Sequence, residues 1–91
     1  MNVQRGEKSF YIGDEHAPDT EMTYVPSGEK LITIDSTHVS EFMKGQGAGK
    51  QLLTALTDWA RKEGLKIIPL CPYAKAQMEK NPVYHDLIHR Q

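Results

Sequence analysis

The segment Lys44–Lys50, with the sequence KGQGAGK, contains three glycines at alternate positions. Glycine lacks a side chain and accepts backbone angles that other residues avoid, so a ligand can approach such a segment closely. An amphipathic helical pattern follows directly, and the first N–H groups of a helix lack partners and carry partial positive charge. With a lysine at each end, the segment predicts a cradle for a phosphate-bearing ligand. A glycine-rich turn that binds nothing is the alternative.

Two widespread phosphate motifs do not match this loop. The pattern G-x-x-x-x-G-K-[ST] would require glycine at position 44 and Ser or Thr at position 51, where the chain has Lys44 and Gln51. The dinucleotide pattern G-x-G-x-x-G fails in both registers, because Lys50 and Leu52 stand where the last glycine is needed. What remains is Gly-x-Gly-x-Gly after a basic residue, at the start of a helix.

Two further side chains have types that suit catalysis. Cys71 is the only cysteine and follows the apolar run Ile67–Leu70. A thiol can act as a nucleophile or as a proton donor, although a free cysteine is also a common small core residue. His38 stands near the end of a predicted strand. Histidine changes charge near neutral pH, which suits a general base, and a structural or surface role is the alternative.

Other polar candidates are weaker. Tyr73 and Tyr84 are candidate proton donors or packing residues, and Glu41 is expected to be a charge beside the loop rather than a base. His85 and His89 are spaced i, i+4, which would place both on one face of a helix and suits metal ligands. No third ligand accompanies them, so we predict a solvated face and no metal site.

Hydrophobic periodicity supplies the elements that must position these groups. Period-2 runs predict strands, and the apolar spacing after Gly47 predicts a long helix that ends at Gly64. The predicted strands span residues 8–13, 21–25, 31–39 and 66–71, and the predicted helices span residues 47–63, 73–80 and 83–89. This order, β-β-β-α-β-α-α, predicts an α/β fold in which a three-stranded antiparallel meander precedes a β-α-β unit, in a mixed sheet covered by the long helix.

The strand before the loop has a clear alternation. One face of the predicted strand 31–39 should carry Ile32, Ile34, Ser36 and His38. Turns are predicted at residues 14–19 and 26–29, because each contains a proline among polar residues. Pro69 has no N–H, so one edge of the last strand is expected to be unpaired.

The bulk composition limits the function classes. The 91 residues allow one domain, which we expect to span residues 1–91. A net charge of −1 argues against a nucleic-acid partner. The single cysteine favours a reducing compartment, and no stretch has the pattern of a signal peptide or a membrane span. We therefore expect a cytoplasmic protein with no nucleic-acid or membrane partner, whose oligomeric state is open at this point.

The glycine loop and the residues around it resemble those of a known family. The loop Lys44–Leu53 is similar to the acetyl-CoA loop [RQ]-x-x-G-x-[GA] of the GNAT superfamily, with Lys44 in the usual Arg or Gln place. More narrowly, the chain resembles the small GNAT-like proteins of the YjdJ type, or N-acetyltransferase domain-containing protein 1 type. The similarity runs nearly end to end and also includes Phe10-Tyr11-Ile12, Thr37-x-Val39, Ile67–Tyr73 (IIPLCPY), and Asn81-Pro82 before Tyr84.

The resemblance implies a minimal GNAT fold and an acetyl-CoA-dependent N-acetyltransferase that acts on a small-molecule or protein amine. It implies that the strands around residues 35–39 and 68–71 splay apart, with pantetheine between them and pyrophosphate on the loop. The implied cofactor-binding residues are Val39, Lys44, Gly45, Gln46, Gly47, Ala48, Gly49, Lys50, Cys71 and Tyr73. The chain lacks the extra helices and strands of ordinary GNAT domains, so the acceptor site should be open, with a wall from residues 73–90.

Cys71 and His38 are the catalytic residues that the resemblance implies. In the narrow family the first splayed strand ends in His-Thr-x-Val, and here Ser36 stands at the histidine position. His38, which shares a face with Ser36, would take over the role of that histidine. The displaced histidine and the missing wall keep a second hypothesis open, a CoA-binding module without efficient transfer. A third hypothesis is a structural or interaction domain that does not bind CoA.

Overall fold

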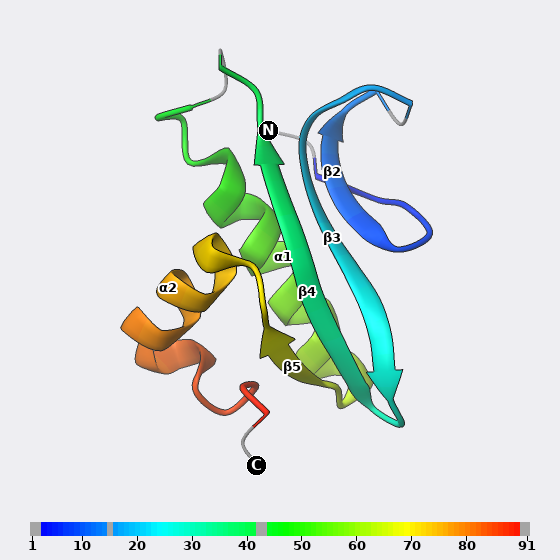
Figure 1. Ribbon diagram of the computed structural model, residues 1–91, viewed down its shortest axis with the longest axis vertical. Helices are drawn as coiled ribbons and strands as arrows, with labels where there is room; N and C mark the ends of the chain where they lie inside the picture. The colour runs from blue at the N-terminus through cyan, green and yellow to red at the C-terminus, as the bar shows by residue number, and fades with distance from the viewer. Residues whose placement is uncertain (1–2, 15, 42–43, 90–91) are drawn as a thin grey trace.

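A computed structural model describes residues 3–14, 16–41 and 44–89 of the chain (Figure 1). Within these residues the elements are β1 (Gln4–Arg5), β2 (Ser9–Gly13), β3 (Pro18–Gly28), β4 (Leu31–Val39), α1 (Ala48–Glu63), β5 (Lys66–Pro69), α2 (Pro72–Lys80) and the 3₁₀ helix η2 (Pro82–Tyr84). The strands form one sheet in the order β1-β2-β3-β4-β5. Neighbours are antiparallel except β4 and β5, which are parallel. The predicted mixed α/β fold is confirmed.

One face of the sheet packs against the helices. Helix α1 contributes Leu52, Leu53 and Leu56, which are at most 1% exposed, because its apolar residues recur at helical spacing. The sheet contributes Met22 and Ile34, and buried residues of α2 join the same cluster. In Figure 1 α1 lies behind β4. The opposite face carries no helix within the described residues, and we call it the open face.

Glycine sets both ends of α1. Gly47 before the helix and Gly64 after it have φ of 75° and 71°, a left-handed conformation that glycine adopts without a steric penalty. The N–H of Leu65 donates to the carbonyl of Ala60 at 2.8 Å, which closes the last turn. The predicted helix end at Gly64 is confirmed. None of the described helices has the length and apolar content needed to cross a membrane.

Strand β3 is longer than predicted at both ends. It begins at Pro18 and ends at Gly28, so the turns predicted at residues 14–19 and 26–29 were partly wrong. Pairing with a strand on each side extends it, and register shifts absorb the irregular residues near each end. The tight turn to β4 instead contains Lys30, with φ of 57°. Strand β1 has only two residues and was not predicted.

A bulge interrupts β4 and overturns the predicted alternation. Thr23 of β3 lies opposite Ser36, while the next residue of β3 lies opposite Ile34, so Asp35 is the extra residue. Ile34 is therefore buried against the helices, whereas Ser36 and His38 are exposed. The prediction that these three side chains share one face was wrong, because a bulge shifts the two-residue period by one residue.

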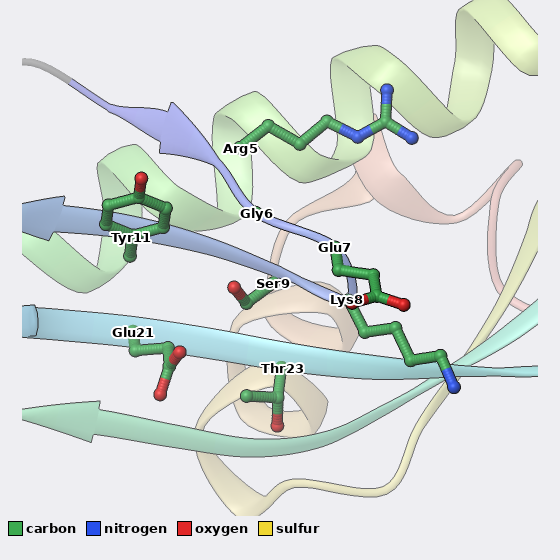
Figure 2. A pocket seen from close by; sticks show the side chains of 8 residues that line it. All are labelled: Arg5, Gly6, Glu7, Lys8, Ser9, Tyr11, Glu21 and Thr23. Atoms are coloured by element: carbon green, nitrogen blue, oxygen red, sulfur yellow. The ribbon is translucent and has the colours of Figure 1, made fainter. Parts of the chain in front are cut away.

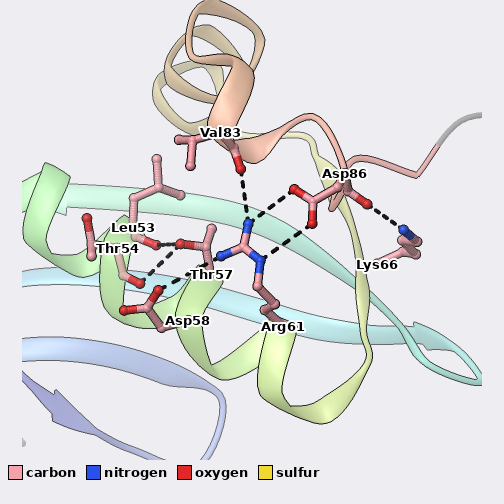
Figure 3. Close-up of polar contacts among 8 residues, drawn as sticks. All are labelled: Leu53, Thr54, Thr57, Asp58, Arg61, Lys66, Val83 and Asp86. Carbon is pink, nitrogen blue, oxygen red and sulfur yellow. Dashed lines mark hydrogen bonds and ion pairs between the residues drawn. The ribbon is translucent and has the colours of Figure 1, made fainter.

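The C-terminal segment is not the predicted helix over residues 83–89. It forms η2, then a turn, and then an isolated parallel bridge between Ile88 and Ile67 of β5. Arg61 of α1 fastens the segment by donating to the carbonyl of Val83 and to the carboxylate of Asp86, both within about 3.1 Å (Figure 3). The hydrogen bond from Arg61 lowers the pKa of Asp86 below its ordinary value. Leu87 of this segment is buried in the core.

Candidate functional site

Strands β4 and β5 part where the bulge begins. Their pairing ends at Ile34 and Pro69, and the carbonyl of Ile34 then accepts the N–H groups of Leu70 at 3.1 Å and Cys71 at 3.0 Å. Strand β4 continues to Val39 without a partner on this side among the described residues. The strands therefore separate as predicted after residue 34 of β4, but Ile68 and Pro69, which were predicted to line the gap, are still paired with β4.

The backbone of β4 offers hydrogen-bonding groups to this gap. The N–H of Ser40 donates to the carbonyl of Asp19 at 2.8 Å, which fixes the residues of β4 that bond to β3. In an antiparallel pair the bonded residues alternate, so the N–H and C=O groups of Thr37 and Val39 point away from β3, into the gap. A ligand with amide groups can pair with them as an added strand would.

A cavity lies where the gap meets the glycine loop. Its volume is about 270 Å³, and its lining residues are Val39, Lys44, Gly45, Gly47, Ala48, Gly49 and Tyr73. All seven are among the ten predicted cofactor-binding residues. The other three do not line it: Gln46 belongs to the same loop, Lys50 lines a second cavity beside α1, and Cys71 directly precedes α2. That these ten residues bind a ligand stays a prediction.

The three glycines of the loop have two different roles. Gly45 and Gly47 have φ of 82° and 75°, and a side chain at either position would point into open space. Gly49 is inside the helix, and a Cβ atom there would lie only 3.0 Å from the Oη atom of Tyr73. Gly45 and Gly47 thus shape the backbone around the cavity, while Gly49 lets the ring of Tyr73 reach the first turn of α1.

The electrostatics at the start of α1 favour an anion. No side chain caps the first turn of this helix, and the turn contains no acidic residue. Lys44 beside it donates to Glu41 at 3.0 Å, and both side chains are exposed. Exposed ion pairs of this kind contribute little to stability, so Lys44 can exchange Glu41 for a phosphate at small cost. The expectation that Glu41 is a charge beside the loop agrees with this contact.

Three reactive side chains meet near the gap. Cys71 is 5% exposed, and its thiol donates to the hydroxyl of Thr37 at 3.1 Å. The pKa of Tyr73 is raised above its ordinary value, first by burial and then by the nearby Tyr84 and Cys71. The shift favours the protonated form of Tyr73. Sequence reasoning missed Thr37, because only the bulge turns this residue toward Cys71.

His38 lies apart from this group. It is exposed on the open face, where its register partner on β3 is Glu21, whereas Thr37 faces Cys71. The structure therefore does not bring the two predicted catalytic residues, His38 and Cys71, into contact. Their catalytic roles stay predictions.

The open face has a depression of its own (Figure 2). It has a volume of about 540 Å³ and is lined by side chains of β2 and β3 and by the loop at residues 5–8. Ser9, Tyr11, Glu21 and Thr23 extend from the two strands on the same side. The acceptor site was predicted to have its wall from residues 73–90, none of which lines this depression. The residues that do line it were not named from the sequence, since their common face is visible only in the folded sheet.

The C-terminal histidines do not form a pair. Because residues 85–89 are not helical, His85 and His89 do not share a helical face. A ring nitrogen of His85 lies 2.9 Å from the carbonyl of Glu79. Within residues 3–14, 16–41 and 44–89, no group of three or more His, Cys, Asp or Glu side chains is arranged to hold a metal ion.

Comparisons with known proteins agree with this geometry. A family model described as GCN5-related N-acetyl-transferase matches residues 9–87. Protein NATD1 of Gallus gallus is 29% identical over 70 residues, which cover 77% of this chain and 64% of that protein, so the chain spans less than two thirds of its length. The NMR solution structure of a GCN5-like protein from Staphylococcus aureus has a TM-score of 0.84 and 42% identity, covering 99% of this chain and 89% of that chain.

Proposed function

We propose that this chain, which belongs to the GCN5-related N-acetyltransferase family, transfers the acetyl group of acetyl-CoA to an amine. The observation that carries the proposal is the cavity at the start of α1, which opens onto the unpaired side of β4. This arrangement supports a phosphate site next to an extended hydrogen-bonding edge. Acetyl-CoA has a pyrophosphate and an amide-bearing arm in the same order.

The glycine loop fits the pyrophosphate. The space beside Gly45 and Gly47 is open, and backbone N–H groups at the start of α1 supply donors without a side chain in the way. Lys44 adds a positive charge once it leaves Glu41. The N–H and C=O groups of Thr37 and Val39 would hold the amides of the pantetheine arm.

The reaction needs a base for the attacking amine and an acid for the leaving thiolate. When bound, acetyl-CoA supplies an activated thioester. Tyr73 lines the cavity and is held against the first turn of α1, so we assign its phenolic O–H as the proton donor to the leaving sulfur. His38 on the open face is our candidate base, which would accept a proton from an amine that arrives over that face. Base and acid then act from different sides of the sheet.

Cys71 has two alternative roles in this scheme. In the first role, the sulfur of Cys71 attacks the thioester carbonyl, the C–S bond to CoA breaks, and CoA leaves as a thiol that carries the proton lost by Cys71. The amine then attacks the acetyl-cysteine, and a proton from the amine returns to the sulfur of Cys71. Alternatively, Cys71 supports Tyr73 and Thr37 without covalent change. The buried thiol and its bond to Thr37 fit the second role without further movement.

Calorimetric titration with acetyl-CoA, followed by release of free CoA with a panel of small amines and lysine peptides, tests the proposal. We expect binding, and CoA release with at least one amine. Absence of binding would refute the proposal, and binding without release for any amine would refute transfer. Intact mass then separates the roles of Cys71: an added acetyl group that is lost in Cys71→Ser indicates the nucleophile, and its absence in an active protein indicates the supporting role.

A further inference from the structure

A chain of three hydroxyl and carboxyl groups crosses from β3 to β4 on the open face. The hydroxyl of Thr23 donates to Oδ1 of Asp35 at 2.6 Å. The hydroxyl of Ser36 lies 2.8 Å from the same Thr23 oxygen. Since Thr23 has one hydroxyl proton and gives it to the carboxylate, Ser36 must be the donor to Thr23. The order is Ser36 to Thr23 to Asp35, and the last bond is charge-assisted.

This chain coincides with the bulge in β4. Asp35 and Ser36 are the two residues that face the single residue Thr23, and both are bonded to its side chain. A bulge can move along a strand unless something fixes its position. If this bulge moved past Val39, then Thr37 would turn to the open face and Cys71 would lose its partner.

The bulge also determines where the gap between β4 and β5 begins. The carbonyl of Ile34, directly before the extra residue, accepts the N–H groups of both Leu70 and Cys71 and so ends the parallel ladder. Beyond it, Thr37 and Val39 present their backbone groups to the gap. A group that fixes the bulge therefore fixes the place where the pantetheine arm would lie.

We propose that Thr23 is a positioning residue for acetyl-CoA: its hydroxyl, bonded to both residues of the bulge, holds the unpaired end of β4 in the register that binds the pantetheine arm. Thr23 itself lies on β3, on the face away from the helices, and does not reach the gap. The inference rests on the function proposed above, because acetyl-CoA is the ligand that the gap would bind.

The test compares Thr23→Val, which keeps the β-branched shape and removes the hydroxyl, with Thr23→Ser, which keeps the hydroxyl. Thr33→Val is the matched control, because the hydroxyl of Thr33 lies 2.5 Å from that of Ser27 between the same two strands, and neither residue belongs to the bulge. The first readout is the Kd of acetyl-CoA by calorimetry. The second is hydrogen exchange of the Leu70 and Cys71 amides without ligand.

We expect Thr23→Val to weaken acetyl-CoA binding by about tenfold, the scale of one lost hydrogen bond to a charged group, and to speed exchange of both amides. Thr23→Ser should restore both readouts, and Thr33→Val should change neither. Unchanged amide exchange in Thr23→Val, or equal weakening in Thr33→Val, would overturn the proposal.

Two outcomes separate this inference from the proposed function. If the unmodified chain does not bind acetyl-CoA, the proposed function fails and the assignment of Thr23 to acetyl-CoA fails with it, while amide exchange still shows whether Thr23 holds the bulge. If the unmodified chain binds and Thr23→Val binds equally well, only the inference fails. Should Thr23→Val not fold, Ser36→Ala removes the donor to Thr23 from an exposed position, and the same readouts apply.

Discussion

Tyr73 reaches the start of α1 because residue 49 has no side chain. The ring lies so close to Gly49 that a single added carbon would have to displace it. The same ring is near Tyr84 and Cys71, and its burial raises its pKa. One glycine inside a helix, normally a weak helix former, thus determines where the proposed proton donor lies.

Gly49→Ala should therefore move Tyr73 toward solvent. Alanine favours the helix by about 1 kcal/mol, so the fold should persist while the ring is displaced. We expect the pKa of Tyr73, followed by NMR of labelled tyrosine, to fall toward its ordinary value, and CoA release to slow by about tenfold or more. An unchanged pKa of Tyr73 would show that the ring is held by something other than the contact at Gly49.

The pKa of Tyr73 also predicts how stability depends on pH. The folded-state value is raised above the ordinary 10.0, so the folded chain holds this proton more tightly than the unfolded chain does. Below pH 10 Tyr73 is protonated in both states, so the free energy of unfolding does not change with pH through this group. Above pH 10 the unfolded chain loses the proton first, and the free energy of unfolding falls as pH rises. Melting temperatures at pH 9 to 11 should therefore fall more steeply for the unmodified chain than for Tyr73→Phe. Parallel curves would contradict the raised pKa.

Residue identities were predictable where the signal is local. The loop glycines could be found because alternate glycines before a helical pattern are visible in the sequence, and the structure places them around one cavity. Thr23 and Thr37 could not be found, since their importance depends on the bulge. His38 was expected near Cys71 because regular alternation was assumed along β4. The bulge shifts that alternation, so His38 lies on the open face instead.

At the level of elements, the two ends of α1 allow a controlled comparison. Gly47 and Gly64 both adopt the left-handed conformation, and a side chain at either would meet no atom within 4 Å. Only Gly47 lines the loop cavity. The two positions thus match in backbone geometry and differ in their relation to the proposed ligand.

Asparagine tolerates the left-handed conformation better than other residues with side chains, so Gly47→Asn and Gly64→Asn should both fold. We expect Gly47→Asn to weaken acetyl-CoA binding at least tenfold in calorimetry, because its side chain would enter the place of the pyrophosphate. Gly64→Asn should bind as the unmodified chain does. Equal affinity of both variants would mean that the ligand lies elsewhere.

The order and type of the principal elements followed from periodicity, and so did the bounds of β4 and the end of α1, whereas the ends of β3 and the form of the C-terminal segment did not. The stripe at Leu52, Leu53 and Leu56 defined α1 without ambiguity, because a buried helical face repeats regularly. Strand β3 extended beyond its apolar residues, since partners on both sides supply hydrogen bonds that no local pattern encodes. The tail formed a bridge to β5 rather than a helix for the same reason.

On the scale of the whole molecule, the described chain has one helical layer on one face of one sheet. The site lies at one end of this core, where β4, the loop and the first turns of both helices meet. Ligand binding should therefore stabilise the whole fold, because the elements around the site are the elements that form the core.

Leu56→Ala tests this coupling far from the site. Leu56 is fully buried in the middle of α1, so its truncation should lower the free energy of unfolding by about 2–5 kcal/mol. Acetyl-CoA at about one hundred times its Kd should restore about 2.7 kcal/mol, as measured by urea unfolding with and without ligand. The Kd of acetyl-CoA should be unchanged in Leu56→Ala. A large increase in this Kd would indicate that truncation of the core residue also alters the structure of the site.

The edge of the sheet at β5 has a consequence for how copies of this chain can associate. Ile67 has both of its outward backbone groups occupied, its N–H by the carbonyl of Leu87 and its C=O by the N–H of His89. Pro69, the last residue of the strand, has no N–H to offer. An incoming strand would therefore find no continuous ladder here on which to polymerise. This edge of the sheet therefore resists pairing with an edge strand of a second copy.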